Sequence, residues 1–460
     1  MANRRPELTR RGLLTSLGGT AVVLSTGVAG ATDQSAATGS TIYVGGSTGY
    51  SSVDGTLYAV DAASGDVDWR FAPQSGGIQS SPTVLDGTLF VGGMDGTLYA
   101  VDAVSGTEAW RFTEPTDYVS SSPTVIGGTV YVGCGDETLY AVDAASGTRR
   151  WAFTEPGGWI ESTPAVADGT VFFGTGGLSG DHTVYAVDAE TGTTEWMFAD
   201  PSAQVDTSPT VADGRVYICD DGGTLYAIET GSGTEDWSFS TRLDQAPTSP
   251  TVADGTVYLY GAGATLYAID ANAGTEKWQF DDPKTNSKSS PTVADGIVYV
   301  GSAEGTLYAV DAATGDRAWA FTEPTEPLNS TPTVADGIVY VGSSGGTLYA
   351  VDAASGSEVW RVNTQSGRLT SSPTVVADPA DGDSVGSRTE LETLGYHDSG
   401  ELGEQAGSNG SSEASRTRTS TETGSGGAST AGTSADGAGF GVVVGLGALV
   451  TGGLLRRRRQ

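Results

Sequence analysis

One sequence pattern returns eight times in this chain of 460 residues, at almost constant spacing. It reads Ala-x-Asp-x-x-(Ser/Thr)-Gly-x-x-x-Trp, with departures in single copies, and every copy ends in a tryptophan. Successive tryptophans are 41 residues apart, except for one step of 45. They are Trp69, Trp110, Trp151, Trp196, Trp237, Trp278, Trp319 and Trp360. Such a period indicates an array of similar units that bury their apolar faces against one another.

Each repeat contains four short runs typical of β-strands. Between Ser289 and Phe321 these runs read SSPTVADG, IVYVG, TLYAVDAATG and RAWAF. They are rich in β-branched and aromatic residues, and Asp-Gly or Gly-Gly pairs supply the positive φ of tight hairpin turns. No run in this part of the chain predicts a helix. Four strands per repeat and a period in the low forties predict an all-β fold: an eight-bladed β-propeller of four-stranded antiparallel blades.

The two ends of the array predict how the ring closes. The first repeat lacks an SPTV strand, and a spare one, Ser372 to Val376, follows the eighth tryptophan. We therefore expect one blade to be closed by strands from both termini, with 371–376 beside 41–45. Closure removes the open strand edges that would promote aggregation. The predicted propeller spans residues 40–377.

The sequence AVDAASGDVDW at residues 59–69 resembles the tryptophan-docking motif of pyrroloquinoline-quinone (PQQ) type propellers. The resemblance covers about residues 40–377, and all eight copies keep the glycine and the tryptophan, although Glu229 replaces the aspartate in the fifth. It implies that each tryptophan packs on the neighbouring blade, so that Trp69 through Trp360 form a structural girdle in the core. The family contains non-catalytic scaffold propellers as well as dehydrogenases that hold PQQ and calcium in the channel.

The charge balance indicates a salt-rich habitat. There are 56 acidic and 23 basic residues, a formal net charge of −33, and the lysines are only Lys277, Lys284 and Lys288. Such self-repulsion is relieved when molar salt shortens the screening length to ~3 Å. The composition resembles that of extreme halophiles; an ordinary acidic secreted protein is the alternative. Nucleic acid and anionic lipid are poor partners for so acidic a ring, and we expect no binding to nucleic acid.

The N-terminal residues 1–31 resemble a twin-arginine signal peptide. Thr9-Arg10-Arg11-Gly12-Leu13-Leu14 precedes an apolar stretch that ends at Ala29, and small residues follow. An ordinary secretory signal with a chance arginine pair is the alternative. Both interpretations predict export of the propeller.

The C-terminal end has the layout of a surface anchor. Residues 378–437 form a Ser/Thr/Gly-rich linker expected to be disordered, and 438–460 combine an apolar run with Arg456 to Arg459. This end resembles an archaeal sorting signal that is exchanged for a lipid, but Ala438 stands where that signal has proline. A retained transmembrane helix is therefore the alternative. We expect an extracellular protein, anchored to the cell surface, that meets the membrane through this anchor only.

The chain has too few cysteines and histidines for several kinds of chemistry. Cys134 and Cys219 fall in the third and fifth blades, with one blade between them, so we expect packing residues rather than a disulfide. His182 and His397 are the only histidines, which leaves no Ser-His-Asp triad and no His-rich metal site in the ring. Asn329 and Asn409 satisfy the N-glycosylation sequon.

The loop that leads to each SPTV strand departs most between copies. Residues three and five positions before its proline vary, whereas the residue between them is mostly apolar. This period of two separates a packed side from a variable side, and the variable side is expected around one mouth of the channel. The candidate ligand contacts are Tyr118, Trp159, Glu161, Asp206, Lys288 and Arg368. Unconstrained drift of surface loops is the alternative.

Two longer loops, Gly45 to Asp54 and Gly174 to His182, break the period. We expect them to rise above one face of the ring, either as contributors to binding or as mere spacers.

These features favour a non-catalytic binding or scaffold module without a cofactor, a monomeric ring that binds protein or glycan partners at the cell envelope. A PQQ- and calcium-dependent dehydrogenase that uses the channel is the alternative, but the large insertions and the vicinal cysteine pair of those enzymes are missing here. A passive envelope component without a specific ligand is a third possibility.

Overall fold

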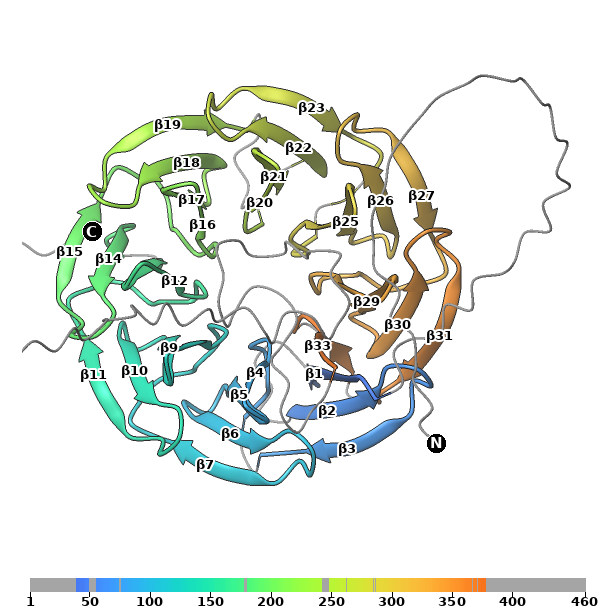
Figure 1. Ribbon diagram of the computed structural model, residues 1–460, viewed down its shortest axis with the longest axis horizontal. Helices are drawn as coiled ribbons and strands as arrows, with labels where there is room; N and C mark the ends of the chain where they lie inside the picture. Colours follow the sequence, from blue (N-terminus) through green and yellow to red (C-terminus); the bar gives the residue numbers. More distant parts are fainter. Residues whose placement is uncertain are drawn as a thin grey trace, which may run out of the picture. The chain divides into compact units, whose positions relative to one another are not determined.

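The described residues form a ring of eight β-sheets (Figure 1). The computed structural model describes residues 39–377 except 49–54, 74–75, 178–179, 242–247, 262, 284, 286, 366 and 370. Within this part there is no helix, and each blade is an antiparallel sheet; in blades two to eight the strands run in sequence order from the channel outward. The predicted eight-bladed propeller is confirmed. The predicted signal peptide, the linker and the anchor lie outside the described residues.

The blades are numbered here by the order of their tryptophans, and their strands have nearly equal lengths. Blade two is β4 (Thr83–Leu85), β5 (Thr88–Gly92), β6 (Leu98–Asp102) and β7 (Glu108–Phe112); blade three is β8 (Thr124–Ile126), β9 (Thr129–Gly133), β10 (Leu139–Asp143) and β11 (Arg149–Phe153); blade four is β12 (Ala165–Ala167), β13 (Thr170–Gly174), β14 (Val184–Asp188) and β15 (Thr194–Phe198); blade five is β16 (Thr210–Ala212), β17 (Arg215–Cys219), β18 (Thr224–Glu229) and β19 (Glu235–Ser240). Blade six is β20 (Thr251–Ala253), β21 (Thr256–Gly261), β22 (Thr265–Asp270) and β23 (Glu276–Phe280); blade seven is β24 (Thr292–Ala294), β25 (Ile297–Gly301), β26 (Leu307–Asp311) and β27 (Arg317–Phe321); blade eight is β28 (Thr333–Ala335), β29 (Ile338–Gly342), β30 (Thr347–Asp352) and β31 (Glu358–Asn363).

Blade one joins the two ends of the array, as the spare strand predicted. It contains β1 (Thr41–Ser47), β2 (Gly55–Asp61) and β3 (Val67–Phe71), completed by β32 (Arg368–Leu369) and β33 (Thr374–Val376). Both late strands pair antiparallel with β1, with Tyr43 opposite Thr374 and Ser47 opposite Arg368. The ring therefore closes by main-chain pairing between segments more than 300 residues apart.

The turns between the first two strands of most blades follow from their Asp-Gly pairs. In blade seven the φ angles are 50° at Asp295 and 73° at Gly296. Aspartate tolerates the left-handed region better than most residues and glycine has no side chain to clash. The pair therefore makes a tight hairpin with the twist of the flanking strands.

The apolar core lies between neighbouring blades. Eight clusters of buried side chains can be distinguished, and each takes residues from two adjacent sheets. Cys134 and Cys219 belong to two different clusters. Both are buried and free, which confirms that they are packing residues.

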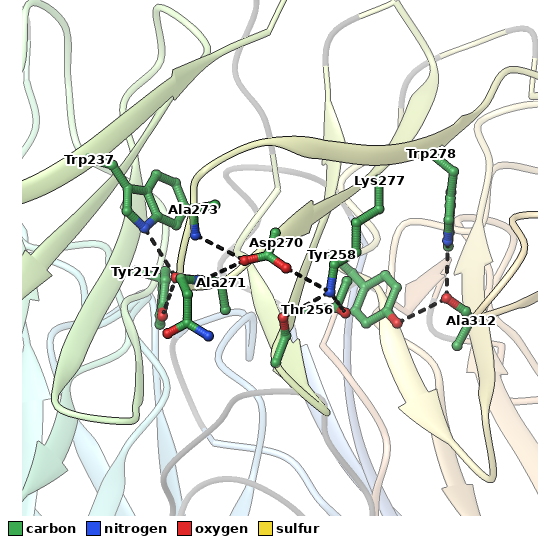
Figure 2. A network of polar contacts seen from close by, with 12 residues as sticks. Tyr217, Trp237, Thr256, Tyr258, Asp270, Ala271, Ala273, Lys277, Trp278 and Ala312 are labelled. Atoms are coloured by element: carbon green, nitrogen blue, oxygen red, sulfur yellow. Dashed lines mark hydrogen bonds and ion pairs between the residues drawn. The ribbon is translucent and has the colours of Figure 1, made fainter.

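The repeated tryptophans bind each blade to the next. Trp237 donates from Nε1 to the main-chain oxygen of Ala271 at 3.1 Å, and the same oxygen accepts from the Tyr217 hydroxyl at 3.2 Å (Figure 2). The indole also lies on Gly274, whose φ is +64° and where a Cβ would come within 2.6 Å of the ring. The motif thus needs its glycine for close approach as well as for backbone conformation.

All eight tryptophans make this contact with the following blade. They are half-buried rather than fully inside the core, because they stand on the outermost strands. The aspartate of the motif shapes the adjoining turn: Asp270 accepts from Ala273 N at 2.9 Å and lies 3.3 Å from Lys277 Nζ (Figure 2).

A second set of contacts runs around the channel and explains the SPTV sequence. The innermost strands are sheet edges, so their main-chain polar groups need partners. Ser81 donates its N–H to the Ser122 hydroxyl of the next blade at 2.9 Å, and Thr83 donates its hydroxyl to the main-chain oxygen of Pro123 at 2.7 Å. Proline is tolerated there because it has no N–H to satisfy.

The threonine-to-proline bond is found at seven of the eight seams, where a seam is the contact between two neighbouring blades. In blade four Ala165 stands in place of the threonine. The seam between blades four and five therefore lacks this side-chain donor.

Candidate functional site

The loops that precede the innermost strands form one end of the ring, which we call the entry-loop end. Their main chain is tied to the loop between the second and third strands of the same blade: Tyr118 O accepts from Gly135 N at 3.0 Å, and Trp159 O accepts from Gly176 N at 3.0 Å. Gln204 O accepts from Asp221 N at 2.7 Å in the same way. These main-chain bonds fix the loops without using the side chains, which leaves the side chains free to vary.

The apolar residue between the variable positions is wedged into the seam. Ile160 and Val205 have exposed fractions of 0% and 1%. Each donates its N–H to the preceding blade, Ile160 to Cys134 O at 3.0 Å and Val205 to Thr175 O at 3.0 Å. The period of two in the sequence thus separates a buried anchor from side chains that face the entry-loop end.

Acidic residues in the second-to-third strand loops hold the entry loops in place. Asp136 accepts from Thr116 N at 2.8 Å and from the Tyr140 hydroxyl at 3.0 Å. Asp220, which is fully buried, accepts from Thr224 N at 2.8 Å and from the Tyr226 hydroxyl at 3.1 Å. These carboxylates are structural, because their hydrogen bonds are made within the loops themselves.

Tyr118 and Glu161 are brought together across the seam between blades three and four. The Tyr118 hydroxyl donates to Glu161 Oε1 at 2.8 Å. Its ring lies over Gly135, where a Cβ would come within 2.9 Å of the ring. Burial, followed by the hydrogen bond to Glu161, raises the pKa of Tyr118 well above its usual value, so the phenol stays a donor.

Trp159 and Asp206 meet at the seam between blades four and five. A Cβ on Gly176 would lie 1.8 Å from Asp206 Oδ1 and 2.8 Å from Trp159 Nε1, so both groups press on this glycine. The indole also covers Gly177, whose N–H donates to Gln204 Oε1 at 2.9 Å. Two side chains of blade five thus hold the longer loop of blade four.

The Asp206 carboxyl has an unusual protonation equilibrium. Burial, followed by the charges of Asp221 and Glu161, raises its pKa from 3.8 to about 7, and Trp159 and Lys288 oppose this shift. Burial and the charges of Asp220 and Glu161 likewise raise the pKa of Asp221. The seam therefore holds carboxyl groups in mutual repulsion, and a proton is retained near neutrality.

Lys288 and Arg368 take different places. Lys288 is exposed on blade seven, and its charge lowers the pKa values of both Asp206 and Asp221. Arg368 lies in β32 opposite Ser47, on the blade that closes the ring, across the ring from the strands of blades four and five (Figure 1). Five of the six candidate residues therefore form one electrostatic group, and Arg368 belongs to another sector.

Comparison of entry loops alone missed Asp221, which lies in the second-to-third strand loop of blade five. The available signal was the pair Asp220-Asp221 directly after β17. The corresponding loops of blades two and seven carry a single acidic residue, and the acidic pair of blade three begins two positions later in its loop. One of the pair is occupied by structural hydrogen bonds, and the other faces the site.

A family model described as outer membrane protein assembly factor BamB matches residues 15–176, 135–279 and 243–395. This chain belongs to that family of PQQ-repeat propellers. No curated protein matches it in sequence.

Solved structures share the fold of this PQQ-repeat propeller. BamB from Moraxella catarrhalis has a TM-score of 0.55 and 21% identity over 66% of this chain and 92% of its own. The computationally designed Ika8 protein has a TM-score of 0.57 and 19% identity over 66% and 96%. The quinohemoprotein alcohol dehydrogenase from Comamonas testosteroni has a TM-score of 0.56 and 16% identity over 70% and 75%.

The residues of this propeller do not fit PQQ and calcium at the entry-loop end. PQQ is a polycarboxylate, and it would have to approach Glu161, Asp206 and Asp221, whose charges already repel one another. Calcium needs about six to eight oxygen ligands. Among the described residues no group of three or more His, Cys, Asp or Glu side chains is arranged to hold a metal ion.

The remaining predicted positions are only partly described. Asn329 is half-buried, and its Nδ2 donates to the Ser344 hydroxyl at 3.1 Å, so the atom that would carry a glycan is engaged. Asn409 and His397 lie outside the described residues, as does most of the Gly45 to Asp54 loop. Within the described ranges no helix has the length and apolar character needed to span a bilayer.

Proposed function

We propose that this chain is an exported PQQ-repeat propeller, anchored to the cell surface, that binds a protein partner through its entry-loop end without catalysing a reaction. The observation that carries the proposal is that the entry loops have a fixed main chain and variable side chains. Their main chain is fixed by hydrogen bonds such as Gly176 N to Trp159 O, while the side chains differ from blade to blade. A rigid scaffold with variable side chains is the usual construction of a recognition surface.

A protein partner is favoured over a glycan by the family. The matching model is described as an assembly factor, and an assembly factor acts on other proteins. Tyr118 and Trp159 add aromatic surface beside Glu161 and Asp206, and aromatic residues are enriched in protein interfaces. The ring closes on itself through β1 and β33, which supports a monomer.

Export and anchoring rest on the chain ends. Arg10 and Arg11 precede an apolar stretch, and a second apolar run lies before Arg456 to Arg459. A ring placed outside the cell on a long polar linker could reach partners at the envelope. Replacement of Arg10 and Arg11 by lysine should retain the protein in the cytoplasm, as measured by cell fractionation.

The dehydrogenase alternative is not favoured, because the acidic seam does not fit a polycarboxylate cofactor. The test is a thermal shift of the full chain with PQQ and calcium, since a ligand that binds only the folded state raises the midpoint of unfolding. A large shift would contradict the scaffold proposal.

Photo-crosslinking in the source cells tests the docking face. A crosslinkable residue at position 118 or 159 should capture one and the same protein, whereas residues at 213 and 254, in the hairpin turns at the other end of blades five and six, should not. Capture of that protein should also weaken when Glu161 and Asp221 are changed to the amides. Equal capture from both ends, or capture of glycan alone, would contradict the proposal.

A further inference from the structure

The seam between blades four and five departs from the repeat in several ways at once. Ala165 removes the threonine donor that seven other seams possess. The step of 45 residues falls in blade four and lengthens the loop that contains Gly176 and Gly177. The one tryptophan outside the docking motif, Trp159, also stands here. This seam therefore differs from the other seams in its hydrogen bonds, in the length of its loop and in its aromatic residue.

A small group of residues, which we call the clasp, joins the two blades at this point. It consists of Trp159, Gly176 and Gly177 of blade four and Gln204 and Asp206 of blade five. Gln204 holds Gly177 by a hydrogen bond of 2.9 Å. Asp206 lies so close to Gly176 that a Cβ there would be 1.8 Å from Oδ1, so a larger residue at position 176 would displace this carboxyl.

The clasp contains two buried polar atoms that are not satisfied. Trp159 Nε1 lies near enough to the Asp206 carboxyl to lower its pKa, but the pair falls short of hydrogen-bond geometry. Both Trp159 Nε1 and Asp206 Oδ1 are left without a hydrogen-bond partner among the described residues. An indole N–H and a carboxylate that face each other in this way form a strong bond once the carboxylate is charged and moves slightly.

Charged groups act on Asp206 from several loops of the entry-loop end, and its own charge acts on the titratable phenol of Tyr118 in blade three. Glu161 comes from the entry loop of blade four, Asp221 from the second-to-third strand loop of blade five and Lys288 from the entry loop of blade seven. His182, at the end of the longer loop of blade four, acts on Asp221. A neutral Asp206 tolerates Glu161 and Asp221 at close range, whereas an ionised one is repelled by both.

We propose that the proton on Asp206 operates a two-state switch in the clasp. In the protonated state the neutral carboxyl lies against Gly176, between Glu161 and Asp221. When the proton leaves to solvent, the carboxylate accepts a hydrogen bond from Trp159 Nε1 and moves away from the other two carboxylates.

The switch lies on the surface that the proposed function assigns to partner binding, and its consequence for binding rests on that proposal. The ionised state adds a negative charge to the entry-loop end and turns Trp159 toward blade five. A basic partner surface should therefore bind more tightly above the transition than below it. The switch itself can be tested without any partner.

The test is the indole N–H resonance of Trp159 in the full-length protein labelled with ¹⁵N-tryptophan. The chain has nine tryptophans, and Trp159→Phe assigns the signal by its disappearance. We expect the Trp159 indole proton to move downfield as pH rises, with a midpoint near the Asp206 pKa of about 7. The eight docking tryptophans are internal controls, because their Nε1 groups donate to main-chain oxygens that do not titrate.

Variants decide which carboxyl is responsible. Asp206→Asn should abolish the movement, Glu161→Gln and Asp221→Asn should lower its midpoint, and Lys288→Gln should raise it. Because imidazole groups titrate near neutrality, His182→Gln is the matched control and must leave a transition in place.

A Trp159 resonance that does not move between about pH 5 and pH 9, or that moves equally in Asp206→Asn, would overturn the switch. If Asp206→Asn fails to fold, the direction of the midpoint shift in Glu161→Gln decides the matter. Failure of the crosslinking experiment would overturn the docking proposal and leave this result standing.

Discussion

Trp360 Nε1 donates a hydrogen bond of 3.0 Å to the main-chain oxygen of Ala62, although 298 residues separate the two positions. The same indole lies on Gly65, which takes φ +76° in the turn after Ala62. This contact is the ring-closing member of the set of eight tryptophan contacts. Its strength therefore helps to determine whether the first and last blades stay together.

Gly65→Ala should destabilise the propeller by more than ~1 kcal/mol, because alanine is strained at positive φ and its Cβ would come within 2.8 Å of the Trp360 ring. Trp360→Phe should cost about 1 kcal/mol for the lost hydrogen bond, in addition to lost packing. Urea unfolding measures both. Gly214→Ala is the matched control, since Gly214 has a similar φ of +74° and nothing lies within 4 Å of its Cβ position; an equal loss in that variant would contradict the role of the tryptophan contact.

Ala165→Thr should stabilise the propeller. The new hydroxyl would donate to Pro209 O, as Thr124 donates to Pro164 O at 2.6 Å one seam earlier, and a hydrogen bond of this kind contributes about 1 kcal/mol. Thr124→Ala should lower stability by a similar amount. Unfolding midpoints of the two variants and the wild type provide the measurement. If both substitutions lowered the unfolding midpoint, the prediction that a threonine at position 165 adds a stabilising hydrogen bond would be wrong.

Stability should fall as the pH rises from mildly acidic to mildly alkaline. Asp206 binds its proton more tightly in the folded state, with a pKa of about 7, than at its ordinary value of 3.8. Its stabilising contribution is therefore complete below the ordinary value and is lost as the pH rises through 7. Asp102 and Asp143 act oppositely, because hydrogen bonds lower their pKa values, that of Asp143 to about 2, and their contribution is lost only in acid.

The measurement is the denaturation midpoint at about pH 5 and about pH 8, in wild type and in Asp206→Asn. The wild type should lose stability between the two, and the variant should lose less. Equal losses would show that the pH dependence arises elsewhere in the chain.

Thermal stability should rise with salt. The net charge is −33, and the screening length falls from ~10 Å at about 0.1 M to ~3 Å at about 1 M. Surface ion pairs such as Arg317 with Asp282, 2.6 Å apart and about half exposed on both sides, contribute little, so their screening should not offset the gain. A melting temperature that fell between about 0.1 M and 1 M potassium chloride would contradict this expectation.

The sequence predicted the ring because its fold depends on local periodicity. The tryptophan period, the Asp-Gly turns and the spare strand 372–376 each reflect contacts that repeat at every blade or at the closure. The structure confirms all three in the β-sheets, in the φ angles of residues such as Asp295, and in the pairing of β33 with β1.

The candidate site could be predicted only in part. The variable positions predicted that the entry loops carry the candidate residues. Which of these side chains contact one another depends on the angle between blades, and no single position of the repeat determines that angle. Tyr118 and Glu161 are 43 residues apart and share a hydrogen bond, whereas Arg368 lies on another sector. Asp221 was missed because its loop lies outside the compared segment, and the half-burial of the girdle tryptophans follows from their place on outermost strands.

The threonine-to-proline bonds between successive SPTV strands have a consequence for how the number of blades arose. The donor of one unit and the acceptor of its neighbour are the same pair of groups at almost every step, so any unit can succeed any other. These bonds do not determine that there are eight blades. The number of blades is therefore set by the number of repeats in the sequence. Duplication or loss of one 41-residue unit would preserve the hydrogen bonds at the seams and change the width of the channel.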